Sequence, residues 1–225
     1  MNIARKIVLV ILCFCALGAQ AQEEKWGMNN PYVDDKIYHF GFQIGANFLS
    51  FATDKAKANV SAPGFGFRVG FVSDLRICKY LNLRFTPGLE FNYSILSYDT
   101  TTHLKQQTVS AIPIIVPLYL KFSAARESNF RPYVLVGGGG SFNINGYDKN
   151  KDAIALLRVD GFCEAGFGCD IYFRWFKLCP QLTYRIGFMD QLNRNHTKVG
   201  EEAYVTVLGS NRLINQAICL TFNFE

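Results

Sequence analysis

Apolar and polar residues alternate along long stretches of this chain. In residues 40–48 every second residue is apolar, and the residues between them are small or polar. Because successive side chains of a β-strand point to opposite faces, this period of two predicts a strand with one apolar and one polar face. The same period predicts eight strands in all, at residues 39–48, 65–75, 80–93, 109–122, 131–144, 158–173, 176–188 and 212–224. The alternation is weaker in 109–122, and Gly137–Gly140 leave the facing of 131–144 open.

Two folds accommodate strands of this kind. A soluble β-sandwich or jelly roll turns the apolar faces inward, whereas a membrane barrel turns them outward to lipid. These segments reach the ~9–11 residues that a tilted transmembrane strand needs, while ordinary strands peak at ~5–6 residues. Their polar faces are also rich in glycine, which suits a crowded interior. The pattern therefore favours an all-β fold, an eight-stranded antiparallel up-and-down transmembrane β-barrel.

Charges on the polar faces balance. Five basic residues (Arg68, Arg84, Arg158, Lys177 and Arg185) oppose five acidic ones (Asp74, Glu90, Asp160, Glu164 and Asp170). A narrow lumen requires such matching, because an unpaired buried charge costs several kcal/mol. The interior of an eight-stranded barrel is just wide enough to be filled by side chains. We therefore predict a closed lumen, not an open porin, with a structural network of six charged residues: Arg68, Arg84, Glu90, Glu164, Asp170 and Arg185.

The connections between strands alternate in length. Residues 52–63, 97–107, 145–157 and 189–211 are long and polar, and residues 76–79, 123–130 and 174–175 are short. Outer-membrane barrels have long external loops and short periplasmic turns, so we expect both chain termini on the periplasmic side. Aromatic residues near predicted strand ends suggest an interfacial girdle: Tyr38, Tyr80, Tyr93, Tyr98, Tyr172 and Trp175.

The N-terminal region divides into two parts before the barrel at 38–225. Residues 1–21 have basic, apolar and small-residue regions in the order of a signal peptide, cut after Ala21. A membrane anchor is the alternative, but the apolar run is shorter than the ~20 residues of a spanning helix. Residues 22–37 form a polar leader that is either disordered or a plug or docking peptide. Its candidate partner contacts are Trp26, Tyr32, Asp34 and Asp35.

Composition and motifs argue against other functions. The net charge of +5 falls to three positive charges once residues 1–21 are removed, which is too small and dispersed for nucleic-acid binding. Five cysteines remain, with no zinc spacing, and we interpret them as small apolar fillers, one internal disulfide being the alternative. A calcium-like run from Asp148 lacks the required glycine and glutamate. Neither His39 nor Ser141 has an assignable catalytic partner, so we expect no enzyme activity, cofactor, metal or small-molecule substrate.

Several stretches together resemble the PorT/SprT family of Bacteroidetes. They are Asn30-Pro31-Tyr32 with His39-Phe40-Gly41-Phe42, Leu83-Arg84-Phe85-Thr86-Pro87-Gly88-Leu89, Val116-Pro117-Leu118-Tyr119-Leu120-Lys121-Phe122 followed by Phe130-Arg131-Pro132-Tyr133, Gly166-Phe167-Gly168-Cys169-Asp170, and Leu220-Thr221-Phe222-Asn223-Phe224-Glu225. The resemblance implies a non-enzymatic outer-membrane component of the type IX secretion system, with gliding motility in some members. Its expected partners are outer-membrane lipid and other secretion-system proteins. A structural or adhesive barrel whose external loops bind a surface partner is the alternative function.

Overall fold

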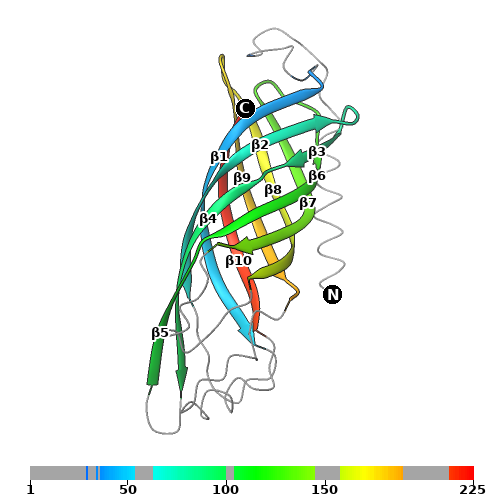
Figure 1. Cartoon of the computed structure of the whole chain (residues 1–225). Helices are drawn as coiled ribbons and strands as arrows, with labels where there is room; N and C mark the ends of the chain where they lie inside the picture. Colours follow the sequence, from blue (N-terminus) through cyan, green and yellow to red (C-terminus); the bar gives the residue numbers. More distant parts are fainter. Residues whose placement is uncertain are drawn as a thin grey trace, which may run out of the picture.

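The computed structural model describes residues 29, 34, 36–53, 63–99, 104–144, 158–189 and 213–225, and nearly all of them lie in β-strands (Figure 1). There are ten strand segments among them: β1 Tyr38–Thr53, β2 Gly64–Arg76, β3 Leu81–Phe85, β4 Gly88–Asp99, β5 Leu104–Ala111, β6 Pro113–Ser123, β7 Phe130–Asn143, β8 Val159–Tyr172, β9 Lys177–Gly187 and β10 Leu213–Phe224. No helix in the described part of the chain is long and apolar enough to cross a membrane.

These ten segments form eight barrel strands. β3 and β4 are one strand interrupted at Thr86 and Pro87, and β5 and β6 are one strand interrupted at Ile112. Proline has no N–H to donate to a neighbouring strand, which explains the first break, although Pro87 O still accepts a 2.9 Å hydrogen bond from Phe71 N. β1 pairs antiparallel with both β2 and β10, so the sheet closes on itself. The predicted eight-stranded antiparallel barrel is confirmed.

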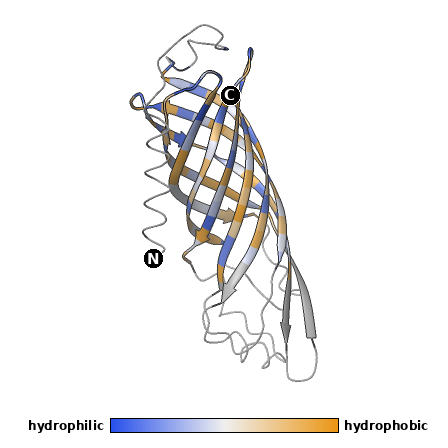
Figure 2. Cartoon of the chain, turned by 180° about the vertical axis from the view of Figure 1, so that it is seen from behind, coloured by the Kyte–Doolittle hydropathy of each residue, from blue (hydrophilic) through white to orange (hydrophobic). Residues whose placement is uncertain are grey.

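The apolar face of each strand lies on the outside of the barrel. Side chains alternate strictly along β6 and β9, with every second residue buried inside. Large apolar side chains cover the exterior, and Phe40 and Phe71 are 72% and 74% exposed. Figure 2 shows apolar and polar residues alternating along the ribbons that form the barrel wall. This arrangement is the reverse of a soluble protein and is typical of a barrel surrounded by lipid.

All described short connections lie at one end of the barrel, which we call the turn end. They are residues 77–80, 124–129 and 173–176. The start of β1 and the C-terminal Glu225 lie at the same end, because the strands run up and down in order. The middle turn is tight, with Ser128 in the left-handed region at φ 53° between the bridged residues Glu127 and Phe130. The opposite end of the barrel, the loop end, is where β1, β4, β7 and β9 end and β2, β5, β8 and β10 begin. Residues 54–62, 100–103, 145–157 and 190–212 lie outside the described residues.

Three expectations from the sequence need correction. Tyr172 is only 2% exposed and points inward, because it shares the parity of Asp170 on β8. Arg158 precedes β8 and is exposed, so it is not part of the interior. Most of the predicted loop 97–107 is strand, since β4 and β5 stay paired from Asn92–Ala111 to Asp99–Leu104. A hairpin can extend in this way beyond the barrel because cross-strand hydrogen bonds do not require a buried face.

Candidate functional site

Inward-facing glycines make room for large charged and aromatic side chains in the barrel. A Cβ atom on Gly137 would lie 2.1 Å from Leu118 O and 2.7 Å from the Tyr119 ring. Glycine is therefore required there for the β6 backbone and the Tyr119 ring to approach β7 this closely. The same close approach occurs at Gly166, where a Cβ atom would lie 2.2 Å from Leu182 O. These glycines allow the interior to be filled by side chains from the other strands.

The first group of interior charges, the central cluster, consists of Arg68, Glu90, Tyr119, Glu164 and Arg185. Each arginine contacts both carboxylates: Arg68 lies 2.7 Å from Glu90 and 3.3 Å from Glu164, and Arg185 lies 2.8 Å from Glu90 and 2.5 Å from Glu164. The Tyr119 hydroxyl donates a 2.6 Å hydrogen bond to the second oxygen of Glu164. All four ionic side chains are nearly inaccessible to solvent. Two positive and two negative charges thus neutralise one another at close range.

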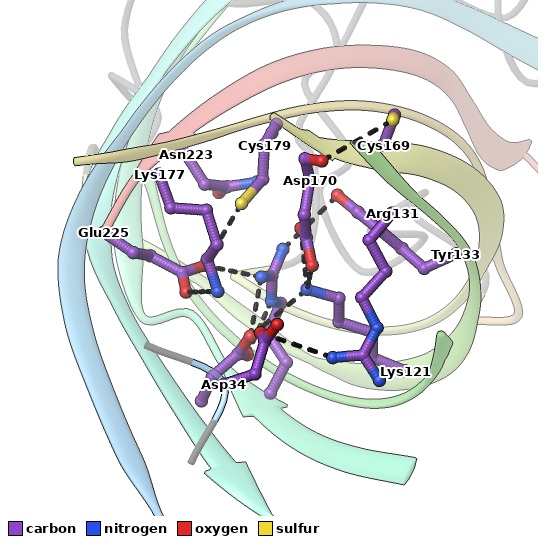
Figure 3. Close-up of polar contacts among 12 residues, drawn as sticks. Asp34, Lys121, Arg131, Tyr133, Cys169, Asp170, Lys177, Cys179, Asn223 and Glu225 are labelled. Carbon is purple, nitrogen blue, oxygen red and sulfur yellow. Dashed lines mark hydrogen bonds and ion pairs between the residues drawn. The ribbon is translucent and has the colours of Figure 1, made fainter. Parts of the chain in front are cut away.

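The second group, the turn-end cluster, lies nearer the short turns and is shown in Figure 3. It consists of Asp74, Arg84, Lys121, Asp170, Lys177 and Glu225. Arg84 donates two hydrogen bonds, of 2.6 and 2.7 Å, to the carboxylate of Asp74. The same guanidinium reaches Glu225 at 2.6 Å, and Lys121 donates to both oxygens of Asp170 at 2.9 and 2.8 Å. Lys177 Nζ lies 2.6 Å from Glu225 Oε2.

Tyr133 joins the positive side chains of the turn-end cluster. Its ring centroid lies 4.2 Å from Lys121 Nζ and 5.5 Å from the Arg84 guanidinium carbon. Cations over an aromatic face are attracted by its negative electrostatic potential. In the two clusters, side chains of opposite charge from most of the strands meet one another inside the lumen. Their chemistry is that of a closed, ionically paired core.

The structure brings all six predicted network residues into these two clusters. Arg68, Glu90, Glu164 and Arg185 lie in the central cluster, and Arg84 and Asp170 lie in the turn-end cluster. Sequence reasoning missed Lys121 and Glu225 as members. The sequence did contain a sign of Lys121, because the alternation places it on the same face of the strand as Tyr119. Pro113, Ile115 and Pro117 also lie on that face and make it look apolar, so the face was not recognised as the inward one. Glu225 gave no signal because it follows the last strand.

Of the four predicted partner contacts, the described residues include only Asp34. Its carboxylate accepts a 2.7 Å hydrogen bond from the Tyr172 hydroxyl and lies 3.3 Å from Arg126 and 3.4 Å from Arg131. These residues form part of the rim at the turn end. Trp26, Tyr32 and Asp35 lie outside the described residues.

The residues considered for catalysis do not meet. His39 is the second residue of β1 at the turn end, whereas Ser141 is near the loop end of β7. Within the described part of the chain no group of three His, Cys, Asp or Glu side chains is arranged to hold a metal ion. All five cysteines after residue 21 are described and have free thiols, with Cys179 and Cys219 buried in the barrel.

Comparison with known proteins identifies the family. A family model described as outer membrane protein beta-barrel domain matches residues 20–193. The chain belongs to this family. No curated protein matches the chain. Among solved structures, Neisserial surface protein A is 10% identical over 84% of this chain and 98% of that one, with a TM-score of 0.44. The outer membrane enzyme PagL is 10% identical over 81% and 97%, with a TM-score of 0.38.

Membership in the outer membrane protein β-barrel family accounts for the two surfaces of this molecule. The apolar exterior lies in the outer-membrane bilayer, and the charged interior is enclosed by the barrel wall. In lipid, every backbone polar group must be satisfied within the protein, which a closed barrel achieves.

Proposed function

We propose that this outer-membrane barrel is a non-enzymatic component of the type IX protein secretion system, needed for export of cargo that carries a C-terminal sorting domain. The observation that supports the proposal is the position of the stretches that resemble the PorT/SprT family. They supply Arg84, Lys121 and Glu225 to the turn-end cluster, and Arg131 to the rim around Asp34. The stretches that carry the resemblance therefore include residues of the barrel interior and of its rim.

The proposed orientation places the turn end in the periplasm. Short turns of outer-membrane barrels face that side, and here they are grouped with the start of β1 and with Glu225. A periplasmic turn end would face both the cargo and the periplasmic parts of a secretion system. The closed interior argues that the barrel assists export without being the conduit.

A deletion strain tests the secretion role. We expect sorting-domain cargo to accumulate in the periplasm of the deletion strain and to return to the medium when the full chain is restored. An unrelated outer-membrane barrel, measured in the same fractions, controls for general damage to the envelope. Normal cargo export from the deletion strain would exclude the proposal.

The adhesive alternative is supported by the β4–β5 hairpin, which extends beyond the point where β4 leaves β2 at Ser94. Replacing residues 190–212 by a short linker, compared with the complete deletion, separates the two functions. An adhesive barrel should lose binding to a cell surface in the linker variant, and export should stay normal even in the complete deletion. The secretion proposal expects export to be retained in the linker variant but lost in the complete deletion.

A further inference from the structure

Two arginines at the turn end are held in place by the barrel itself. Arg126 Nε donates a 2.9 Å hydrogen bond to Ser128 O within the turn between β6 and β7. Arg131, near the start of β7, donates to Ala124 O at 2.8 Å and to Lys79 O at 2.6 Å. Both guanidinium groups are therefore fixed by main-chain carbonyls, whatever else binds to them.

Tyr172 completes a three-residue site with these arginines, which we call the rim site. The Arg126 guanidinium carbon lies 3.6 Å from the centroid of the Tyr172 ring, a stacked arrangement that orders both groups. With the leader in place, the arginine side chains are only 9% and 11% exposed. In the occupied site their positive charge is poorly hydrated, which strengthens its attraction to the bound carboxylate.

Among the described residues, one carboxylate occupies the rim site, and it belongs to the leader. Asp34 Oδ1 accepts from the Tyr172 hydroxyl at 2.7 Å and from Arg131 at 3.4 Å, while Oδ2 accepts from Arg126 at 3.3 Å. The occupant is not deeply buried, since the Asp34 side chain is 25% exposed. It can be reached from solvent without opening the barrel.

The barrel also binds the main chain of the leader. Arg76 donates to Asp34 O, and Arg126 donates to Asn29 O. Asn29 N donates to Asn129 Oδ1 at 2.8 Å, and the Asn29 side chain donates to Tyr172 O at 3.1 Å. The barrel thus contacts two main-chain carbonyls and one carboxylate of the leader. Proteins recognise peptides by such a combination of main-chain and side-chain contacts, whereas an isolated surface ion pair involves only two side chains.

We propose that Arg126, Arg131 and Tyr172 form a binding site for an aspartate-bearing peptide, filled by the chain's own leader and open to an acidic segment of a second protein once the leader leaves. Only three residues separate Asp34 from Tyr38 of β1. So short a tether gives the leader an effective concentration of about millimolar or more. The leader thus blocks the site in the intact chain. The inference does not depend on the secretion role.

A peptide-binding experiment on the full chain after removal of residues 1–21 tests this site. The acceptor is the Asp34→Asn variant, whose leader has lost its carboxylate, and the probe is a fluorescent peptide of residues 28–37. We expect saturable binding of the wild-type peptide to this variant. Binding of the same peptide carrying Asp34→Asn should be about tenfold weaker, since charge-assisted hydrogen bonds are lost. Binding to the wild-type chain should be weaker by a similar factor, because its own leader competes.

Three controls make the result decisive. Glu127→Gln removes an exposed carboxylate at the same end of the barrel that takes no part in the contacts with Asp34 given above, and this chain should behave as wild type. Arg131→Gln added to the Asp34→Asn chain should abolish the preference for the aspartate peptide. The mobility difference between unheated and heated samples in SDS gels verifies that each barrel is folded. Each of three outcomes would overturn the proposal. The first is equal binding of the two peptides, the second is equal binding of the wild-type peptide to the wild-type and Asp34→Asn chains, and the third is no saturable binding up to about 1 mM.

Discussion

Glu164 has the largest number of ionic and hydrogen-bonding partners in the central cluster. Its carboxylate accepts from Arg68, Arg185, the Tyr119 hydroxyl and the Thr183 hydroxyl, the last at 3.4 Å. It is buried at 1% exposure, so water cannot replace these partners. The two arginines depend on Glu164 and Glu90 for neutralisation.

Replacing Glu164 by Gln should therefore destabilise the barrel strongly. The variant keeps the volume but leaves one buried positive charge in excess, which costs about 3–5 kcal/mol. Unfolding by urea in lipid vesicles, followed by the SDS-gel mobility shift, measures the change. Glu127→Gln is the matched control, because Glu127 is exposed in a turn and its described contact is a main-chain bridge. Equal effects of the two variants would contradict this account of the cluster.

Adding Arg68→Gln to Glu164→Gln should recover part of the lost stability. Removal of one guanidinium restores the charge balance with Glu90 and Arg185, so the two effects should not add. The same urea titration measures the coupling. If the double variant is as unstable as the sum of the single variants, the two residues are not coupled in the way the 3.3 Å contact implies.

At the scale of a strand, β7 shows that the need for glycine depends on which face of the strand the residue occupies. Gly137 faces inward against Tyr119, and a Cβ atom there would clash with Leu118 O at 2.1 Å. Gly140 faces outward, and its nearest neighbour would be Asp160 O at 3.9 Å. A side chain is therefore excluded at Gly137 but has room at Gly140, although the two glycines are only three positions apart.

Gly137→Ala and Gly140→Ala form a matched pair for this argument. We expect Gly137→Ala to lose about 1–3 kcal/mol, because Tyr119 and the neighbouring backbone must shift to admit the methyl group. Gly140→Ala should be close to neutral. The folded fraction after refolding into detergent, read from gel mobility, distinguishes them. Similar loss in both variants would mean that close packing of Tyr119 does not limit folding.

At the scale of the whole molecule, the exterior should respond to charge according to depth in the bilayer. Leu182 lies at the centre of β9 and faces outward, while Ile37 is exposed just before β1 begins. Leu182→Arg should cost about 2–4 kcal/mol, whereas Ile37→Arg should cost about 0–1 kcal/mol, because the interface hydrates the charge. Urea unfolding in vesicles measures both. Equal costs would contradict the placement of Leu182 in hydrocarbon.

The filled lumen predicts that the barrel does not conduct small solutes. The interior of eight strands has room for side chains only, and the two ionic clusters occupy it in this molecule. Proteoliposomes should not swell in isotonic solutions of small sugars. Liposomes containing an open porin provide the positive control. Swelling at a rate similar to the porin would show that the clusters leave an aqueous passage.

Periodicity alone predicted the strands and their faces, as particular segments show. In β6 and β9 the inside–outside pattern in the sequence is the same as in the structure. It succeeds because the facing of a strand residue depends only on its parity along the chain. It failed where a residue lies beyond a strand, as for Arg158, or where a hairpin continues without a buried face, as for residues 97–107.

The sequence by itself determined the eight strands, the facing of all of them except residues 131–144, and the presence of charges inside, because each depends on local order along the chain. Only the tertiary structure decided which charges meet. Arg68 and Glu164 are 96 residues apart, and Arg84 and Glu225 are 141 apart. Their contact depends on strand register and on closure of β1 with β10, and neither leaves a local signature. The docking of Asp34 has a similar origin. Arg131 and Tyr172 are neighbours because β7 pairs with β8, but the leader that precedes β1 reaches them only when the barrel closes.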